Sequence, residues 1–178
     1  MFKALFRKDP SFEAGRALYA AAVEQARQPA LYRDFNAPDT VEGRFEQVAL
    51  HVYLVMRRLK GDEAAKKASQ SLFDVMFQNM DDSLRELGVG DLQVGKKVRA
   101  LAENFYGRIG AYEAALKDEA PAADLGAALA RNIYGVASSK DAEALADYVR
   151  AADAFLARQP AARIANGVVS FAPVERSA

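Results

Sequence analysis

The sequence contains no cysteine, no tryptophan and only one histidine, His51. Without cysteine the chain cannot form disulfide bonds, thiolate metal sites or a cysteine nucleophile. A single histidine also leaves little room for a histidine-based metal site. We therefore expect no metal and no cofactor. The lack of disulfides fits a reducing compartment, so we expect a cytoplasmic protein.

Long apolar runs and an excess of charge of either sign are missing as well. No stretch approaches the ~18 consecutive apolar residues that a membrane-spanning helix needs. The 24 basic and 24 acidic residues give a net charge of zero, whereas nucleic-acid-binding proteins are usually clearly basic. The sequence therefore predicts no nucleic-acid partner. It predicts at most peripheral contact with the inner face of a membrane, to which the apolar and basic residues of segment 1–10 could contribute.

The common sequence motifs of catalysis and nucleotide binding are absent too. No GxGxxG, Walker loop, HExxH or GxSxG occurs, and no Glu-x-x-His motif of a di-metal bundle. Asp81 and Asp82 are adjacent, so on a helix they point about 100° apart and cannot act as a facing pair. We therefore expect a binding protein and not an enzyme. A hydrolase or transferase that uses His51 and nearby carboxylates is a rival interpretation.

What the sequence does contain is strong helical patterning. The composition is 51% hydrophobic, rich in alanine and modest in glycine and proline, which favours helix. Apolar residues at helical spacing, between proline, glycine and capping residues, predict helices over 11–27, 39–60, 62–87, 92–117, 122–133 and 141–158. The expected fold is an all-α, single-domain bundle of about six helices with an extended C-terminal tail. We expect one domain over residues 1–178, in which residues 1–10 and 160–178 are peripheral.

The predicted helix 39–60 is apolar on two faces, because Leu50 and Leu54 lie opposite its main apolar stripe. Such a helix is buried centrally or offers one face to a partner. On the next helix, two methionines lie beside two phenylalanines, a combination found on adaptable peptide-binding surfaces. Ordinary core packing is the competing interpretation for both helices.

The stretch from Asp74 to Arg108 predicts a helical hairpin with a charged turn. Gly88 suits the position that stops a helix, and Asp91 suits the N-cap of the next one. A partly buried arginine at position 108 needs an acidic partner, which we expect on the preceding helix. We predict a structural ion-pair network that fixes the two helices together, made of Asp74, Asp81, Arg85, Glu86, Asp91 and Arg108.

Two segments carry a family resemblance. They are DTVEGRFEQVALHVYLVMRRL, residues 39–59, and DVMFQNMDDSLRELGVGDLQVGKKVRALAENFYGRIGAY, residues 74–112. Together they resemble the ubiquinol–cytochrome c chaperone family over roughly residues 38–116. Members of that family are helical assembly factors of respiratory complex III. Mitochondrial members carry a longer N-terminal region, so the resemblance points to a bacterial-type member.

The resemblance implies an ATP-independent assembly chaperone that acts in biogenesis of the respiratory chain. It would bind newly made cytochrome b, a hydrophobic membrane-protein client, and support assembly of complex III. The ribosome and a small partner subunit are further implied partners. The alternative is a helical binding protein that holds a lipid or a quinone-like hydrophobic ligand between its helices.

A transmembrane client is apolar, so its binding surface should be an exposed apolar patch with a charged rim. We expect this patch on helix 39–60 and on the exposed side of helix 62–87, with Arg108 as a further rim residue. The client-binding candidates are Arg44, Leu50, His51, Leu54, Arg57, Arg58, Phe73, Met76, Phe77, Met80 and Lys96.

Overall fold

The computed structural model describes residues 9–176, so most of the predicted N-terminal peripheral segment lies outside the described residues. Within this range the chain contains no β-strand. Its α-helices are α2 (Pro10–Ala26), α3 (Pro29–Arg33), α4 (Val41–Leu59), α5 (Lys66–Glu86), α6 (Asp91–Ala115), α7 (Ala122–Leu129), α8 (Lys140–Ala157) and α9 (Ala161–Ala165). A 3-10 turn precedes α5 and a π-helical turn follows α7. The prediction of an all-α fold is confirmed.

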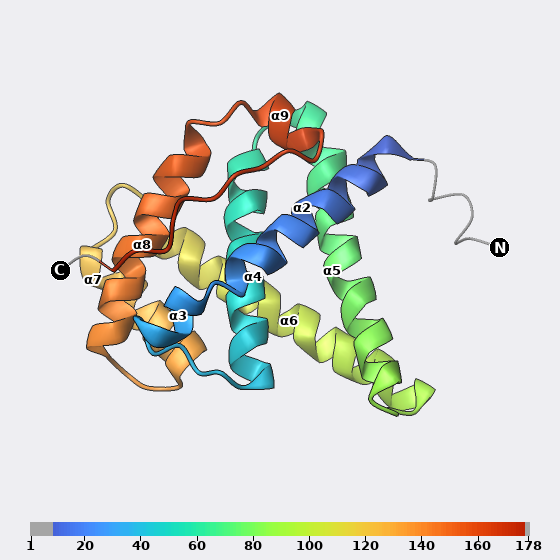
Figure 1. The fold of residues 1–178 in the computed structure, drawn as a ribbon, viewed down its shortest axis with the longest axis horizontal. Coiled ribbons are helices and arrows are strands. Elements are labelled where there is room, and N and C mark those ends of the chain that lie inside the picture. The colour runs from blue at the N-terminus through green and yellow to red at the C-terminus, as the bar shows by residue number, and fades with distance from the viewer. Residues whose placement is uncertain (1–8, 177–178) are drawn as a thin grey trace.

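Helix α4 runs through the middle of the molecule (Figure 1). Helix α2 crosses it and packs on both α4 and α5. Helices α7 and α8 lie on one side of α4, and the α5–α6 hairpin extends on the other. Helix α6 packs against α5 and α7 and so connects the two sides. None of the helices within residues 9–176 is long and apolar enough to cross a bilayer.

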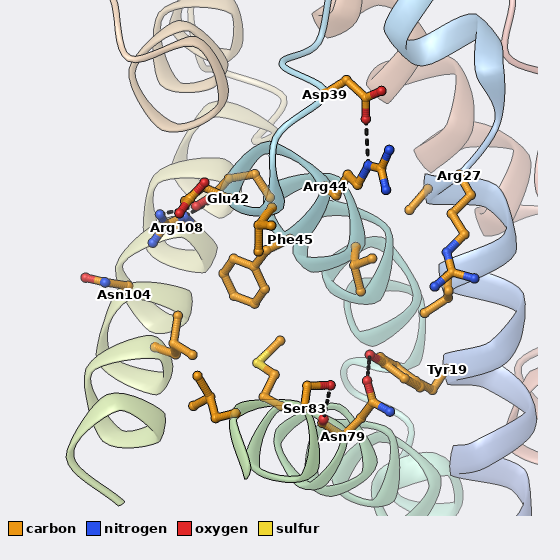
Figure 2. Close-up of a pocket in the computed structure, with 18 of the residues that line it drawn as sticks. Tyr19, Arg27, Asp39, Glu42, Arg44, Phe45, Asn79, Ser83, Asn104 and Arg108 are labelled. Atoms are coloured by element: carbon orange, nitrogen blue, oxygen red, sulfur yellow. Dashed lines mark hydrogen bonds and ion pairs between the residues drawn. The ribbon is translucent and has the colours of Figure 1, made fainter. Parts of the chain in front are cut away.

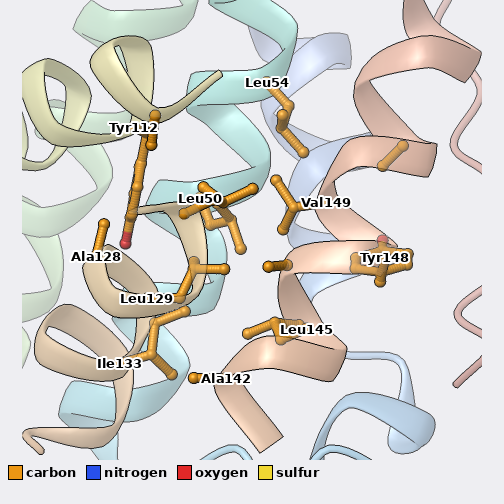
Figure 3. Close-up of a cluster of buried hydrophobic side chains, with 14 of the residues drawn as sticks. Leu50, Leu54, Tyr112, Ala128, Leu129, Ile133, Ala142, Leu145, Tyr148 and Val149 are labelled. Atoms are coloured by element: carbon orange, nitrogen blue, oxygen red, sulfur yellow. The ribbon is translucent and has the colours of Figure 1, made fainter. Parts of the chain in front are cut away.

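The two apolar faces of α4 are buried in two separate cores. Leu50 and Leu54 face a core formed with α7 and α8 (Figure 3). Val52 and Val55 belong to a second core formed with α2 and α5. Burying an aliphatic side chain of this size contributes roughly 1.5–3 kcal/mol, so the central position of α4 accounts for its apolar content. The idea that Leu50 and Leu54 offer a face to a partner is therefore wrong for the folded chain.

Two helix starts differ from the sequence prediction. Helix α4 begins at Val41 and not at residue 39, and its cap is Thr40, whose Oγ1 accepts a hydrogen bond from the Gly43 amide at 3.0 Å. Helix α6 is preceded by Gly90, and Asp91 is its first residue and not its cap. A carboxylate in the first turn still interacts favourably with the positive end of the helix dipole.

Gly88 ends α5 as the sequence predicts. Its φ of 79° is left-handed, a conformation that glycine adopts without a steric penalty. The Gly88 amide donates to the Arg85 carbonyl at 2.9 Å, and the Val89 amide donates to the Leu84 carbonyl at 3.0 Å. This is the Schellman pattern, and it makes the turn from α5 into α6 short and well defined.

The C-terminal segment is extended from Val168 to Arg176 and runs along α8 (Figure 1). The Gln25 side chain of α2 donates a hydrogen bond to the Ala172 carbonyl at 2.8 Å. The predicted extended tail is confirmed, although the short helix α9 occupies its beginning.

Candidate functional site

An open groove of about 1570 Å³ is lined by residues of α2, α3, α4, α5 and α6 (Figure 2). Phe45 of α4 projects into the space between these helices. Along one edge, Tyr19 of α2 donates a hydrogen bond to Asn79 of α5 at 3.0 Å. The lining is mainly apolar, and its larger apolar side chains are Tyr19, Val23, Tyr32, Val41, Phe45, Val48, Met80, Leu84, Leu87 and Leu101.

The groove exists because α6 stands away from α4. On the other side, α2 and α5 are close, since a Cβ at Gly15 of α2 would lie 2.6 Å from the carbonyl carbon of Ser71. The backbones of α4 and α6 do not pack in this way, and α6 is held by α5 and α7 instead. As a result Phe45 and Val48 of α4 stay only half-buried.

Charged side chains form the rim of the groove. Arg44 and Asp39 make an exposed ion pair, with 2.6 Å between Nε and Oδ1. Arg108 of α6 forms a two-pronged ion pair with Glu46 of α4, and both side chains are largely buried. Burial raises the pKa of Glu46, and the Arg108 guanidinium offsets this only in part. This pair is a direct link between α4 and α6 across the groove.

Cations outnumber carboxylates around the groove. Its cationic lining residues are Arg27, Arg33, Arg44, Lys97 and Arg108, and its carboxylates are Asp39, Glu42 and Glu46. An apolar channel with a basic rim is suited to an apolar segment flanked by polar or acidic groups.

The volume of the groove is sufficient for a helix. Pockets for drug-sized ligands measure about 300–1,000 Å³, less than the 1570 Å³ found here. An α-helix about 10 Å across takes up roughly 120 Å³ per residue, so a groove of this volume corresponds to about three to four turns.

Three of the residues singled out from the sequence line the groove. Arg44 and Arg108 lie on its rim, and Met80 lies in its apolar lining. These three positions come from three different helices, α4, α6 and α5. The fold therefore brings together a small part of the predicted patch.

Four other apolar candidates lie in the core. Leu50, Leu54 and Met76 have no exposed surface, and Phe77 is buried as well. A fully buried side chain cannot contact a partner while the chain is folded. The expectation that these residues form an exposed patch is wrong, and core packing explains them.

His51 is also fully buried, with both ring nitrogens hydrogen-bonded. Nδ1 donates to the Gln47 carbonyl at 2.7 Å, and Nε2 accepts from the Tyr148 hydroxyl at 2.9 Å. Burial lowers the pKa of His51 to about 4. The ring is therefore neutral near pH 7 and occupied by structural partners, which supports neither a binding nor a catalytic role.

Arg57 and Arg58 hold helices together instead of forming a rim. Arg57 of α4 pairs with Glu113 of α6 at 3.2 Å and with Asp153 of α8 at 3.1 Å. Arg58 donates to the Gln159 carbonyl just beyond α8 at 2.6 Å. These contacts engage both guanidinium groups in the fold, so their assignment to a client-binding rim loses its basis.

Phe73 and Lys96 lie on the α5–α6 hairpin outside the groove. Phe73 is half-buried and packs against Phe77 and Tyr106, with ring centroids 4.6 and 5.5 Å apart. Lys96 is exposed on α6. Client binding by these two residues stays a prediction.

The predicted ion-pair network is present at the turn of the hairpin. Arg85 Nε lies 2.5 Å from Asp81 Oδ2 within α5, and Arg85 also pairs with Asp91 at the start of α6. All three side chains are accessible to solvent, where such pairs contribute little stability. Their main effect is to fix the direction of the turn.

The remainder of the network is different from the prediction. The acidic partner of Arg108 is Glu46 of α4, and not an acid of α5, because Arg108 turns toward α4. Asp74 accepts a hydrogen bond from Gln70 of its own helix at 2.8 Å. Glu86 is exposed and forms no ion pair within residues 9–176.

Most residues that line the groove were not predicted from the sequence to be functional. The larger of these side chains include Tyr19, Val23, Arg27, Phe45, Val48, Leu84, Leu87, Lys97 and Leu101. The available signal was the width of the apolar stripes on α4 and α5, which exceeds what one neighbouring helix can cover.

The groove and the fold together define a class of protein. Within residues 9–176 no group of three or more His, Cys, Asp or Glu side chains could hold a metal ion. An all-α chain with a long, open, apolar groove and a charged rim is typical of a helical binding protein.

Comparison with known proteins identifies the family. Residues 33–171 match the sequence profile of the ubiquinol-cytochrome C chaperone family, and the chain belongs to this family. The family consists of assembly chaperones of complex III and is not a known class of enzyme. The resemblance seen in the two sequence segments is confirmed.

Two relatives show how far the similarity extends. The ubiquinol-cytochrome-c reductase complex assembly factor 1 of Xenopus laevis is 26% identical over 147 residues, which cover 80% of this chain and 72% of that protein. The crystal structure of the Cbp3 homolog from Brucella abortus is 38% identical and has a TM-score of 0.82, with 97% of each chain covered.

Proposed function

We propose that this chaperone binds newly made cytochrome b by holding one of its apolar transmembrane segments in the groove. The client stays protected from aggregation until assembly of complex III proceeds. The observation that carries the proposal is the groove itself, which is mainly apolar, open to solvent and equal in volume to several turns of a helix. Membership of a family of assembly chaperones supports the same proposal.

The charged rim of the groove suits the polar ends of a transmembrane client. A transmembrane segment is apolar along its length but ends in polar groups at the membrane interface. Arg44 and Arg108 lie on the walls where such polar groups would meet the protein. Because Arg108 is paired with Glu46, its charge is largely neutralised before the client arrives.

In this proposal the chain works as one helical domain in the cytoplasm, at the inner face of the membrane. A ribosome or a small partner subunit would bring the client to the groove. The client needs no nucleotide-driven release, which agrees with the lack of a Walker loop in the sequence.

Site-specific photo-crosslinking tests the groove. A photoreactive amino acid at Leu84 of α5 or Leu101 of α6, which both line the groove, should crosslink to cytochrome b while it is being made. Matched control positions are Tyr106 and Val136, which are exposed and lie outside the groove. Both controls should give little crosslinked product.

Equal crosslinking from groove and control positions would contradict the proposal. A lipid or quinone that copurifies with the chain in a one-to-one ratio, and that blocks the crosslinks, would favour the alternative of a small-ligand site. The volume of the groove already exceeds the usual range for such ligands.

A further inference from the structure

The tip of the α5–α6 hairpin, residues 87–92, projects from the body of the molecule (Figure 1). The Schellman bonds around Gly88 and the pairing of Arg85 with Asp91 give this turn a defined shape. The tip is therefore a firm, convex projection.

Two large apolar side chains on the tip are directed into solvent. Leu87 is 76% exposed and Leu92 is 90% exposed. Leu92 belongs to neither hydrophobic core. Leucines that are this exposed, close together and at a projecting turn give up the burial that usually stabilises a leucine, which suggests that they are buried against something else.

Basic residues follow Leu92 along the same face of α6. Lys96 is four residues after Leu92 and Arg99 is seven residues after it, so the three side chains lie on one side of the helix. All three are exposed. The carboxylates of Glu86 and Asp91 are exposed at the tip as well, and Arg85 pairs with Asp91, so the excess of positive charge begins one turn behind Leu92. An apolar side chain at the end of a projection, with cations one and two turns behind it, has the arrangement of a segment that enters a lipid interface.

The tip is continuous with the groove. Leu87 belongs to both, because it also lines the groove wall. Val41, at the start of α4, lines the same groove and is 78% exposed. In Figure 1 the start of α4 and the hairpin tip lie at the same edge of the molecule. One end of the groove therefore opens where the exposed leucines are.

We propose that the hairpin tip docks on an anionic lipid surface. Leu87 and Leu92 enter the interface, and Lys96 and Arg99 pair with lipid phosphates behind them. A convex apolar tip suits a deformable lipid surface, whereas a protein partner would need a matching pocket. Docking at this point turns the open end of the groove toward the bilayer, so the inference deepens the proposed function and rests on it for its purpose.

Two leucines give only weak, reversible binding, and basic residues near the surface add to it. This is the binding expected of a chaperone that must leave the membrane with or without its client.

Vesicle binding of the purified full chain tests the inference without any client. The wild type should sediment with vesicles that contain phosphatidylglycerol, and less with pure phosphatidylcholine. The double variant Leu87→Ser/Leu92→Ser should bind about tenfold or more weakly, because it loses two apolar side chains. Lys96→Gln/Arg99→Gln should lose the preference for anionic vesicles and the sensitivity to salt.

The matched control is Val136→Ser/Val168→Ser, which changes two exposed apolar residues far from the tip and should bind as the wild type does. All six positions of the three double variants are exposed, and circular dichroism checks that each variant is folded. Failure of the wild type to bind, or wild-type binding by Leu87→Ser/Leu92→Ser, would overturn the inference. Because the vesicles contain no cytochrome b, either failure leaves the crosslinking test of the groove unaffected.

Discussion

The residues that the sequence made conspicuous mostly serve the fold. His51 is the clearest case, because its ring lies in a buried chain of hydrogen bonds. The Gln25 side chain of α2 donates to the Tyr148 hydroxyl of α8 at 2.9 Å, and that hydroxyl donates to His51 Nε2 of α4. Phe171 of the C-terminal segment covers the ring, with centroids 5.6 Å apart. One histidine thus joins three helices and the tail.

The burial of His51 predicts a dependence of stability on pH. Its pKa is about 4 in the folded chain and 6.5 when exposed, so between these values the unfolded chain binds more protons. The contribution of neutral, buried His51 to the free energy of unfolding should therefore be fully present above about pH 6.5, and it should decrease as the pH falls toward 4. This one group accounts for a loss of about 2 kcal/mol between pH 7 and pH 5.

Urea unfolding at pH 7 and pH 5 measures this loss, with His51→Gln as the comparison. The variant should be less stable at pH 7 but should show a smaller difference between the two pH values. An equal difference in both proteins would mean that other groups cause the pH dependence.

At the scale of elements, the surroundings of the glycines show which helices are in close contact and which helix surfaces are open. A Cβ at Gly15 of α2 would meet the backbone of α5 at 2.6 Å, so α2 and α5 can approach only because this side chain is absent. A Cβ at Gly107 or Gly110 of α6 would meet nothing within 4 Å. These two glycines weaken α6 without serving a helix contact. Helix α2 is thus a fixed part of the bundle, whereas one side of α6 is uncovered.

Alanine substitutions should therefore have opposite effects in the two helices. Gly15→Ala should lower the free energy of unfolding by roughly 1–2 kcal/mol, because α2 must move away from α5. Gly110→Ala should raise it by about 1 kcal/mol, because alanine has the better helix propensity and open space around it. Thermal and urea unfolding measure both changes. A stabilised Gly15→Ala variant would show that the α2–α5 contact adapts easily.

At the scale of the whole molecule, the groove is the feature that no single helix contains. Five helices, α2 to α6, line it, and the buried ion pair of Arg108 and Glu46 connects α4 with α6. Apolar side chains that face this open space bury less area than core residues. The folded chain should therefore gain stability when a suitable apolar helix fills the groove.

A peptide with the sequence of a cytochrome b transmembrane span, kept in solution with mild detergent, should raise the melting temperature. At a peptide concentration about 100 times the Kd, the expected gain is about 2.7 kcal/mol, or about 5–10 °C for a chain of this size. The variant Leu84→Glu/Leu101→Glu places two charges in the groove lining and should lose the shift. Tyr106→Glu, outside the groove, should keep it.

The same shift in Leu84→Glu/Leu101→Glu as in the wild type would contradict binding in the groove. A charged polar peptide of equal length is the control for nonspecific stabilisation, and it should leave the melting temperature of the wild type unchanged.

The sequence by itself determined the six longer helices, the glycine stop at Gly88, the charged turn around Arg85 and the family, but not the short helices α3 and α9. These features depend on neighbours along the chain, because helical spacing, capping and turn hydrogen bonds act within a few residues. The tertiary structure alone decided that His51 is buried, that Arg108 pairs with Glu46 and that Phe45 lines a groove. Helical spacing tells which side chains share a face, but what covers that face depends on residues far away in the chain. For the same reason most apolar residues of the patch predicted from the sequence lie in the core, while the groove became visible only after five helices were placed together.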